Sequence, residues 1–132
     1  MKRKNISTNN SWENTIGYSR AVKVCSYVYI SGTTATNEQG RIVGLGDPYL
    51  QTKQILKNIE SALNLAGASL EDVVRTRIYV TNIDRWKTIS KAHCEVFVEI
   101  RPASSMVEVN RLIAPGMLVE IEADALITEK AN

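Results

Sequence analysis

The alternation of apolar and polar residues is clearest near the end of the chain, over residues 117–127. Every second position there is apolar (Val119, Ile121, Ala123, Ala125 and Ile127), and the positions between carry the carboxylates Glu120, Glu122 and Asp124. A period of two places these sets on opposite faces of a β-strand. We therefore expect one covered apolar face and one face with a row of carboxylates. Glu108 joins this row if the preceding strand-like run, 105–110, pairs with it.

Two other segments have the three- and four-residue spacing of amphipathic helices. The first opens at Asp47-Pro48, because Asp caps free N–H groups and Pro suits the first turn, and it ends at Gly67. The second is capped by Asp84 and ends before Pro102. The apolar face of the first comprises Tyr49, Thr52, Leu56, Ile59, Leu63 and Ala66, and that of the second Trp86, Ile89, His93, Val96 and Phe97. Each helix can cover a sheet.

Three further segments are rich in β-branched and aromatic residues, as strands prefer. Residues 21–25 and 27–31 form a predicted hairpin, and 73–81 a third strand. The order β-β-α-β-α-β-β predicts an α+β fold with one mixed sheet and both helices on one face. The length of 132 residues fits a single domain over 1–132. Residues 1–16 are polar and predict a loose lead-in anchored by Trp12.

The polar sheet face carries charges of both signs. In the third strand Val74, Thr76, Ile78 and Val80 share one side, and Arg75, Arg77 and Tyr79 share the other. If the strands form one sheet, these arginines lie on the side of the carboxylates. Such a semi-polar face with several tyrosines is typical of an assembly surface, so we expect a homo-oligomer. The alternative is a monomer whose outer sheet face is hydrated.

Composition excludes several classes of function. The formal net charge is +2, from 16 Lys and Arg against 14 Asp and Glu, and no basic groove predicts a nucleic-acid partner. No apolar run approaches the roughly 20 residues of a membrane span, and no signal peptide is visible. Cys25 and Cys94 do not make a disulfide framework, which favours a reducing, cytoplasmic setting.

Motifs for metals and cofactors are absent from the sequence. His93 is the single histidine, which rules out a two-histidine metal site within one chain, and no phosphate-binding or dinucleotide-binding glycine loop occurs. We therefore expect no metal and no cofactor, and we interpret both cysteines as structural. The remaining chemistry is that of carboxylates, hydroxyls, arginines and backbone groups. It suits the hydrolysis of a substrate that is already reactive.

Four stretches together resemble the RidA family, also called YjgF or endoribonuclease L-PSP. They are GYSRAVKV, YVYISGTTA, NLAGASLEDVVRTRIYVTNI and RPASSMVEVNRLIAPGMLVEIEADALI, and the resemblance runs from Gly17 to Ile127. It implies a chorismate-mutase-like fold, a homotrimer with a barrel-like core and small-molecule sites in clefts between subunits. It also implies hydrolysis of reactive enamines and imines, such as 2-iminopropanoate and 2-iminobutanoate, to 2-keto acids and ammonia without a cofactor.

The resemblance assigns roles to four residues. Glu120 matches the residue that positions or activates the water, and Tyr18 matches the tyrosine that packs on the ligand. Ser31 and Gly32 match the segment that lines the pocket after the second strand. Two alternatives stay open, since Glu120 could be a structural partner of the strand arginines and Tyr18 a plain interface contact.

One position departs from the pattern of active members. The family reads Pro-Ala-Arg-Ser where this chain has Pro-Ala-Ser-Ser, so Ser104 stands where an arginine clamps the substrate carboxylate. Met106 occupies a position that is often Cys. Arg101, three residues before Ser104, could reach the same cleft, or it could be a surface or intersubunit ion-pair residue. Arg111 is interpreted as a surface or intersubunit salt-bridge residue and not as a site residue.

Three functions therefore follow from the sequence. The first is a hydrolytic deaminase of imines or enamines, and the second is a trimeric protein that binds a small metabolite without turning it over. The third is a ribonuclease, which the family's alternative name suggests and which the absence of a histidine pair, a metal site and a basic groove disfavours.

Overall fold

The computed structural model describes residues 2–8 and 10–128, and within them six strands form one sheet in the order β1-β2-β3-β6-β4-β5. The strands are β1 (Arg3–Ile6), β2 (Ala21–Val24), β3 (Tyr27–Thr33), β4 (Val73–Val80), β5 (Ala103–Glu108) and β6 (Val119–Leu126). The helices are α1 (Ser11–Ile16), α2 (Pro48–Leu65) and α3 (Trp86–Phe97), with 3-10 turns at Leu70–Asp72 and Ile83–Arg85. Only the β4–β5 pair is parallel. The predicted α+β class and mixed sheet are confirmed.

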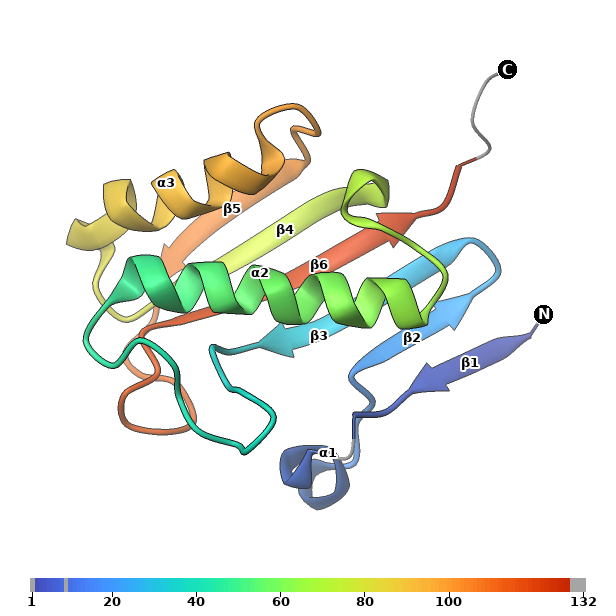
Figure 1. Ribbon diagram of the computed structural model, residues 1–132, viewed down its shortest axis with the longest axis horizontal. Helices are drawn as coiled ribbons and strands as arrows, with labels where there is room; N and C mark the ends of the chain where they lie inside the picture. The colour runs from blue at the N-terminus through green and yellow to red at the C-terminus, as the bar shows by residue number, and fades with distance from the viewer. Residues whose placement is uncertain (1, 9, 129–132) are drawn as a thin grey trace.

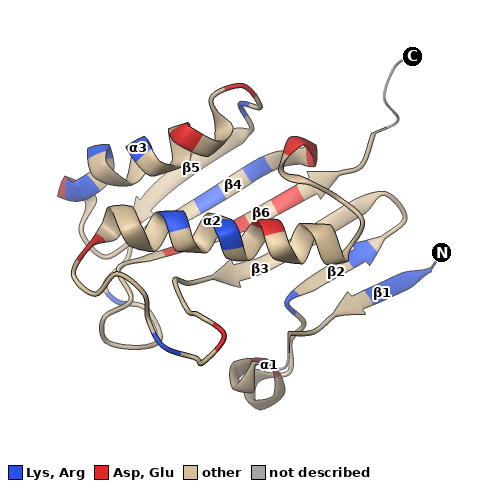
Figure 2. Ribbon diagram, in the orientation of Figure 1, with Lys and Arg blue, Asp and Glu red and all other residues tan. Residues whose placement is uncertain are grey.

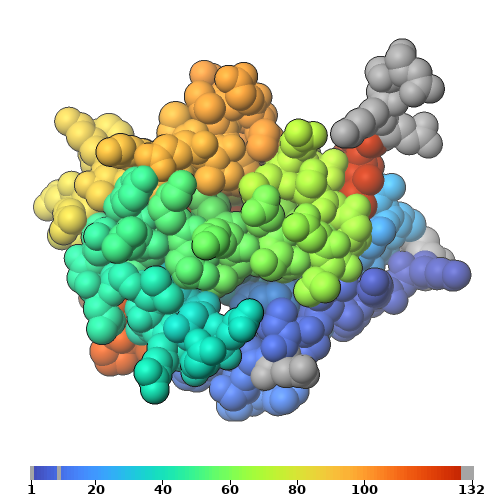
Figure 3. All heavy atoms as spheres, in the orientation of Figure 1, coloured from blue at the N-terminus to red at the C-terminus, as the bar shows by residue number. Residues whose placement is uncertain are grey.

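Helices α2 and α3 lie over the same face of the sheet (Figure 1). In the space-filling view their side chains hide most of that face (Figure 3). The core between the layers is mostly apolar, with Ile59 and Leu63 of α2 and Val119 and Ile121 of β6 each 0% exposed. Each such side chain contributes about 1.5–3 kcal/mol on burial. The alternation predicted for β6 is confirmed along the whole strand.

A buried glutamine ties α2 to the start of β6. Gln51 is 0% exposed, and its side-chain amide donates to the carbonyls of Gly44 (3.1 Å) and Gly116 (2.8 Å). Its Oε1 accepts from the backbone N–H of Leu118 at 2.9 Å. Three polar backbone groups are thereby satisfied inside the protein, as burial requires. The helical spacing had not placed Gln51 on the buried face, because it is polar.

Strand β6 lies between β3 and β4, so it does not pair with β5. The conditional pairing of these two C-terminal runs was therefore wrong, and β5 is an edge strand beside β4. Glu108 stands opposite Val80, on the helix-covered side, and accepts from the N–H of Ile83 at 3.0 Å. It caps a turn and does not join the carboxylate row. Periodicity reports which face a side chain takes but not which strand lies next to it.

The uncovered sheet face carries the expected mixture of charges. Figure 2 shows basic segments of β4 beside acidic segments of β6. Arg77 pairs with Asp124 at 3.1 Å, and the hydroxyl of Tyr79 donates to Glu122. The pKa of Tyr79 is raised, first by this hydrogen bond and then by burial. The prediction that strand arginines and carboxylates share one side is confirmed.

Two side chains predicted to face the core are exposed. The register of β4 against β6 shifts between Val73 and Arg75, so Val74 is the extra residue of a β-bulge and is 49% exposed. Trp86, at the start of α3, is 50% exposed. The turn before it is capped by Asn82, whose side chain accepts from the N–H of Asp84, and not by Asp84 as expected.

Residues 1–16 were predicted to be a loose lead-in, and the described part of this segment corrects that view. Strand β1 pairs with β2 at the sheet edge, and α1 follows it. The buried anchor is Glu13, 4% exposed, whereas Trp12 is half-buried. The Glu13 carboxylate accepts from the hydroxyls of Ser7 (3.0 Å) and Thr8 (2.6 Å). A polar composition hid this element, because its anchor is a hydrogen-bonded carboxylate.

Replacing Glu13 with Gln is expected to lower the free energy of unfolding by about 1–3 kcal/mol at neutral pH. Burial raises the pKa of Glu13, but hydrogen bonds from Thr8 and Ser7 outweigh it, so the net pKa is lowered. Because the pKa is lower in the folded state, the ionised carboxylate stabilises the fold at pH values above the unfolded-state pKa. This stabilisation is lost as the pH falls through the folded-state pKa. Urea unfolding of both proteins should therefore differ near neutrality and converge in acid. Glu60→Gln, exposed on α2, is the control.

The structure also bears on membrane insertion. Over residues 2–8 and 10–128 no helix has the length and apolar character needed to cross a membrane.

Candidate functional site

A β-bulge in β3 brings two predicted site residues against β6. The pairing runs from Ile30 opposite Ala123 to Thr33 opposite Ile121, so β3 holds one more residue than β6 between these points. Ser31 and Gly32 occupy the bulge. The Ser31 hydroxyl donates to the carbonyl of Ser19 at 2.7 Å, which fixes the bulge to the segment before β2. Bulges of this kind often redirect a strand beside a functional site.

Gly32 makes room for the carboxylate of Glu120. A Cβ atom at position 32 would lie 2.5 Å from Oε2 of Glu120. The carboxylate therefore lies directly over the glycine backbone. Glycine is required here for close approach and not for a special backbone angle, because no positive φ occurs at this residue.

Arg20 completes this region and was not predicted as a site residue. Its Nη2 donates to the carbonyl of Gly32 at 2.6 Å, and its guanidinium lies 5.6 Å from the centre of the Tyr18 ring. Its Nε is buried without a hydrogen-bond partner. The signal was present in the GYSR segment, where Arg20 lies two residues after Tyr18.

These residues line a cavity of about 510 Å³, which we call the Glu120 cavity. Tyr18, Ser31, Gly32 and Glu120 all contribute to it, so the structure brings these four predicted residues together. Apolar walls come from Trp12, Ile16, Leu112, Ile113 and Met117, and further polar groups from Arg20, Arg111 and Glu122.

The environment of Glu120 changes its acidity. Burial raises the pKa of Glu120, the nearby Glu122 carboxylate raises it further, and Arg20 lowers it by less. Arg77 pairs with Asp124, and no ion pair of Glu120 occurs in the described part of the chain. The alternative in which Glu120 serves as a structural partner of a strand arginine is not what the structure shows. A carboxylate with a raised pKa in a cavity is suited to accept a proton.

Gly32→Ala is expected to push the Glu120 carboxylate toward solvent, because the added methyl group takes its place. The pKa of Glu120 should then move down toward 4.5, as burial decreases. An NMR titration of the side-chain carboxyl carbon measures this. Stability should change little, since the displaced group is the end of a flexible side chain. An unchanged Glu120 pKa would contradict the assignment.

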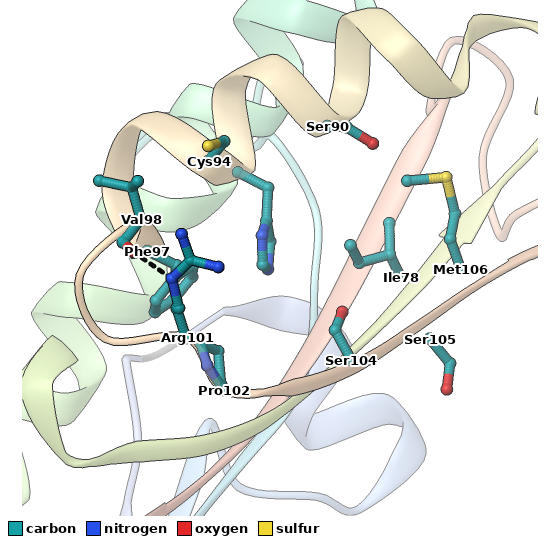
Figure 4. A pocket seen from close by; sticks show the side chains of 11 residues that line it. Ile78, Ser90, Cys94, Phe97, Val98, Arg101, Pro102, Ser104, Ser105 and Met106 are labelled. Carbon is teal, nitrogen blue, oxygen red and sulfur yellow. Dashed lines mark hydrogen bonds between the residues drawn. The ribbon is translucent and has the colours of Figure 1, made fainter.

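The other predicted residues line a second cavity of about 490 Å³, the Arg101 cavity, between α3 and β5. Ser104 and Met106 stand on the helix side of β5, opposite Thr76 and Ile78. Figure 4 shows them facing Ser90 and Cys94 of α3, with Arg101 rising from the loop between the two elements. Arg101, Ser104 and Met106 are thus brought together.

Arg101 has an unusual backbone. Its φ is +53°, a left-handed conformation that glycine usually adopts after a helix. Its N–H donates to Phe97 O at 2.8 Å, and its Nε donates to Val98 O at 2.9 Å. Among residues 2–8 and 10–128, neither Nη group has a hydrogen-bond partner and no carboxylate pairs with Arg101. No ion pair of Arg101 is therefore observed within the described residues, and the intersubunit ion pair stays a prediction. The Nη groups are available to the cavity.

The two cavities share no lining residue. Within one chain, the predicted site residues therefore form two separate groups, one around Glu120 and one around Arg101. Among the described side chains, no group of three or more His, Cys, Asp or Glu could hold a metal ion. The first group offers a proton acceptor and the second a cationic donor. A proton acceptor and a cationic donor are the groups that hydrolysis of a small anionic substrate requires, and here they line separate cavities.

Comparisons with known proteins identify the family of this chain. The family described as "Endoribonuclease L-PSP" matches residues 8–127. The 3-aminoacrylate deaminase RutC of Acinetobacter baylyi is 35% identical over 108 residues, covering 82% of this chain and 85% of its own length.

Solved structures extend the similarity to the fold. A YjgF/YER057c/UK114 family member from Mycobacterium tuberculosis is 48% identical, with a TM-score of 0.87, and the match covers 96% of this chain and 100% of that one. TdcF of E. coli with bound serine is 29% identical, with a TM-score of 0.77 over 84% of this chain and 88% of its own. The chain therefore belongs to the endoribonuclease L-PSP family, which is also known as the RidA or YjgF family.

Proposed function

We propose that this protein is a hydrolytic deaminase that converts reactive 2-imino acids, or the enamines in equilibrium with them, to 2-keto acids and ammonia. The observation that carries the proposal is the Glu120 carboxyl, placed over Gly32 in a cavity and with a raised pKa. An imine carbon is electrophilic, so the protein need only hold the substrate and manage one water and its protons.

Glu120 would take a proton from the attacking water. The water oxygen bonds to the imine carbon while the nitrogen gains a proton, giving a carbinolamine. The C–N bond then breaks, ammonia leaves with a further proton, and the carbon–oxygen double bond of the keto acid forms. Water is the only co-reactant, and the chemistry requires no metal or cofactor.

Arg101 would hold the substrate carboxylate in place of the family arginine that Ser104 replaces. Its Nη groups have no partner within the described chain, and its side chain is fixed to α3 through Val98. A guanidinium can bind a carboxylate through two parallel hydrogen bonds. The strained backbone of Arg101 supports this role, because strain of this kind is usually retained at functional sites.

A homotrimer would join the two half-sites. If the Glu120 cavity of one copy meets the Arg101 cavity of the next, a closed ring creates three complete sites. The uncovered sheet face would line the barrel-like core. Its stacked tyrosines Tyr27 and Tyr29 are 52% and 49% exposed, with ring centres 6.4 Å apart, and tyrosine is enriched in interfaces. Exposed thiols at Cys25 and Cys94 support placing the protein in the reducing cytoplasm.

Two relatives support the substrate class. The similar protein of Acinetobacter baylyi is named as a deaminase of 3-aminoacrylate, an unsaturated amino acid. TdcF of E. coli is described with bound serine, a small amino acid. Both names fit a small ligand that carries a carboxylate and a nitrogen.

The test is ammonia release from freshly generated 2-iminopropanoate and 2-iminobutanoate, with light scattering of the same sample to measure the oligomer. We expect ammonia to form faster with the protein than in buffer, and a particle with the mass of three chains. Ammonia formation at the buffer rate across both substrates would overturn the deaminase.

The second candidate is a protein that binds a small metabolite without turnover, and Ser104 favours it, since a neutral hydroxyl replaces the family's charged clamp. A saturable rise in melting temperature with a 2-keto acid, without any acceleration of ammonia release, would support this candidate.

A further inference from the structure

Three side chains from three different elements are hydrogen-bonded in a row beside the Arg101 cavity. Nε2 of His93, on α3, lies 3.0 Å from the hydroxyl of Thr76, on β4. The Thr76 hydroxyl donates to the hydroxyl of Ser104, on β5, at 2.8 Å. His93 and Ser104 line the cavity, whereas Thr76 is 0% exposed beneath them. We call this row the His93–Thr76–Ser104 chain.

The number of hydrogens on each group decides which group donates in each of these two hydrogen bonds. The Thr76 hydroxyl has one hydrogen, and Ser104 receives it. Thr76 cannot also donate to His93, so Nε2 of His93 must carry a hydrogen and donate to Thr76. The Ser104 oxygen then accepts from Thr76, and its own hydrogen is left to donate into the cavity. Burial lowers the pKa of His93, so a neutral ring with its hydrogen on Nε2 is sufficient.

The inward side of β4 shows that this row is not a packing accident. Val73, Ile78 and Val80 face the helices from the same side of the strand, and each is nearly or fully buried. Valine has almost the shape of threonine and would fill position 76 without a buried hydroxyl. An unpaired buried hydroxyl is unfavourable, and the Thr76 hydroxyl is paired with both His93 and Ser104.

We propose that the His93–Thr76–Ser104 chain orients the Ser104 hydroxyl as a hydrogen-bond donor that, together with Arg101, binds one carboxylate of an acidic ligand. Ser104 supplies a neutral donor from β5 and Arg101 a charged donor from the loop after α3, and both line the same cavity. Two converging donors fit an anionic acceptor. Thr76 and His93 are positioning residues, since they act through Ser104. The inference deepens the proposed function and rests on it for the choice of a 2-keto or 2-imino acid as ligand.

The test compares Thr76→Val, which removes the hydroxyl, with Thr76→Ser, which keeps it. Binding of 2-oxobutanoate and of its methyl ester to the full-length protein is measured by calorimetry. We expect Thr76→Val to weaken binding of the acid about 10- to 100-fold, and Thr76→Ser to stay within about threefold of the wild type. In turnover, KM should rise in Thr76→Val while kcat is nearly unchanged. The ester should bind weakly to all three proteins.

A second pair of variants, at His93, tests the same inference if Thr76→Val fails to fold. His93→Gln keeps an N–H donor near Thr76, and His93→Leu does not, so only the second should lose affinity for 2-oxobutanoate. Equal affinity in Thr76→Val and wild type, equal loss in Thr76→Val and Thr76→Ser, or equal binding of ester and acid would overturn the inference.

The two proposals fail in different ways. If the wild type releases ammonia and Thr76→Val has the same KM, the hydrogen-bonded chain is unimportant and the deaminase stands. If 2-oxobutanoate binds and Thr76→Val loses it, but no ammonia forms from the imines, the carboxylate site stands and the deaminase falls. If the wild type neither binds the acid nor releases ammonia, both are overturned.

Discussion

Replacing Glu120 with Gln is expected to lower ammonia release from 2-iminobutanoate by about 10²- to 10⁴-fold. The amide keeps the size of the side chain but cannot accept the proton of the attacking water. The fold should be unaffected, because Glu120 makes no ion pair within the described chain. The measurement is kcat and KM for both proteins, and we expect the loss in kcat.

The pH profile gives an independent check on the same residue. Burial, and then the charge of Glu122, raise the pKa of Glu120 above the ordinary 4.5. The active form is the carboxylate, so wild-type activity should fall as pH decreases, with a midpoint above 4.5. The residual activity of Glu120→Gln should lack this fall. Asp124→Asn, four residues further along the same face of β6, is the control. An active Glu120→Gln protein would rule out Glu120 as the base.

Arg101→Gly is expected to make the protein more stable and a poorer enzyme. A left-handed residue other than glycine is unfavourable by about 1–2 kcal/mol, and glycine removes that strain. Loss of the bond from Nε to Val98 offsets part of the gain. The substrate loses its charged partner, so KM should rise by about 10²-fold or more. Thermal unfolding and steady-state kinetics measure the two effects.

Cys25 offers a matched control for this variant. Its φ is +55°, in the turn between β2 and β3, and it lines neither cavity. Cys25→Gly should therefore relieve similar strain and leave KM unchanged. A Cys25→Gly protein with the same rise in KM would show that stabilisation itself, and not loss of the guanidinium, weakens the substrate complex. Arg101→Lys should recover part of the affinity, since lysine keeps the charge without the fork.

Mixing the two impaired proteins, Glu120→Gln and Arg101→Gly, tests whether the site is shared between copies. In the proposed trimer, some interfaces of a mixed assembly would combine an intact Glu120 with an intact Arg101. Such mixtures should regain activity after unfolding and refolding together. No recovery, from two impaired proteins that each assemble as trimers, would show that both groups act within one chain.

Regular periodicity made much of the fold predictable. The strict alternation in β6 and the capped, amphipathic α2 were both recognisable because each buries one continuous face. Strand neighbours were not predictable in this way, since the position of β6 between β3 and β4 depends on contacts far apart in the chain. The bulge at Val74 was not predictable either, because its one extra residue turns an apolar side chain outward.

Some site residues were likewise predictable from the sequence, and others were not. Motifs indicated Glu120 and Gly32, and the missing arginine at Ser104 suggested Arg101 as a replacement. No pattern along the chain indicates that a glycine lies against a carboxylate from another strand. Thr76 and His93 were missed as partners of Ser104, because a single polar residue in an apolar row has no sequence signal until its neighbours are known. The same reason hid Glu13 and Gln51.

The hydrogen bonds of Gln51 have a consequence for motion. One side chain joins the N-terminal turn of α2, the loop at Gly44 and the segment that leads into β6. These parts cannot open independently without leaving a buried amide unsatisfied, so they should open and close as one cooperative unit. Glu120 lies two residues after Leu118, whose N–H donates to Gln51. Motion of the loop at Gly44 is therefore expected to reach Glu120, the proposed proton acceptor.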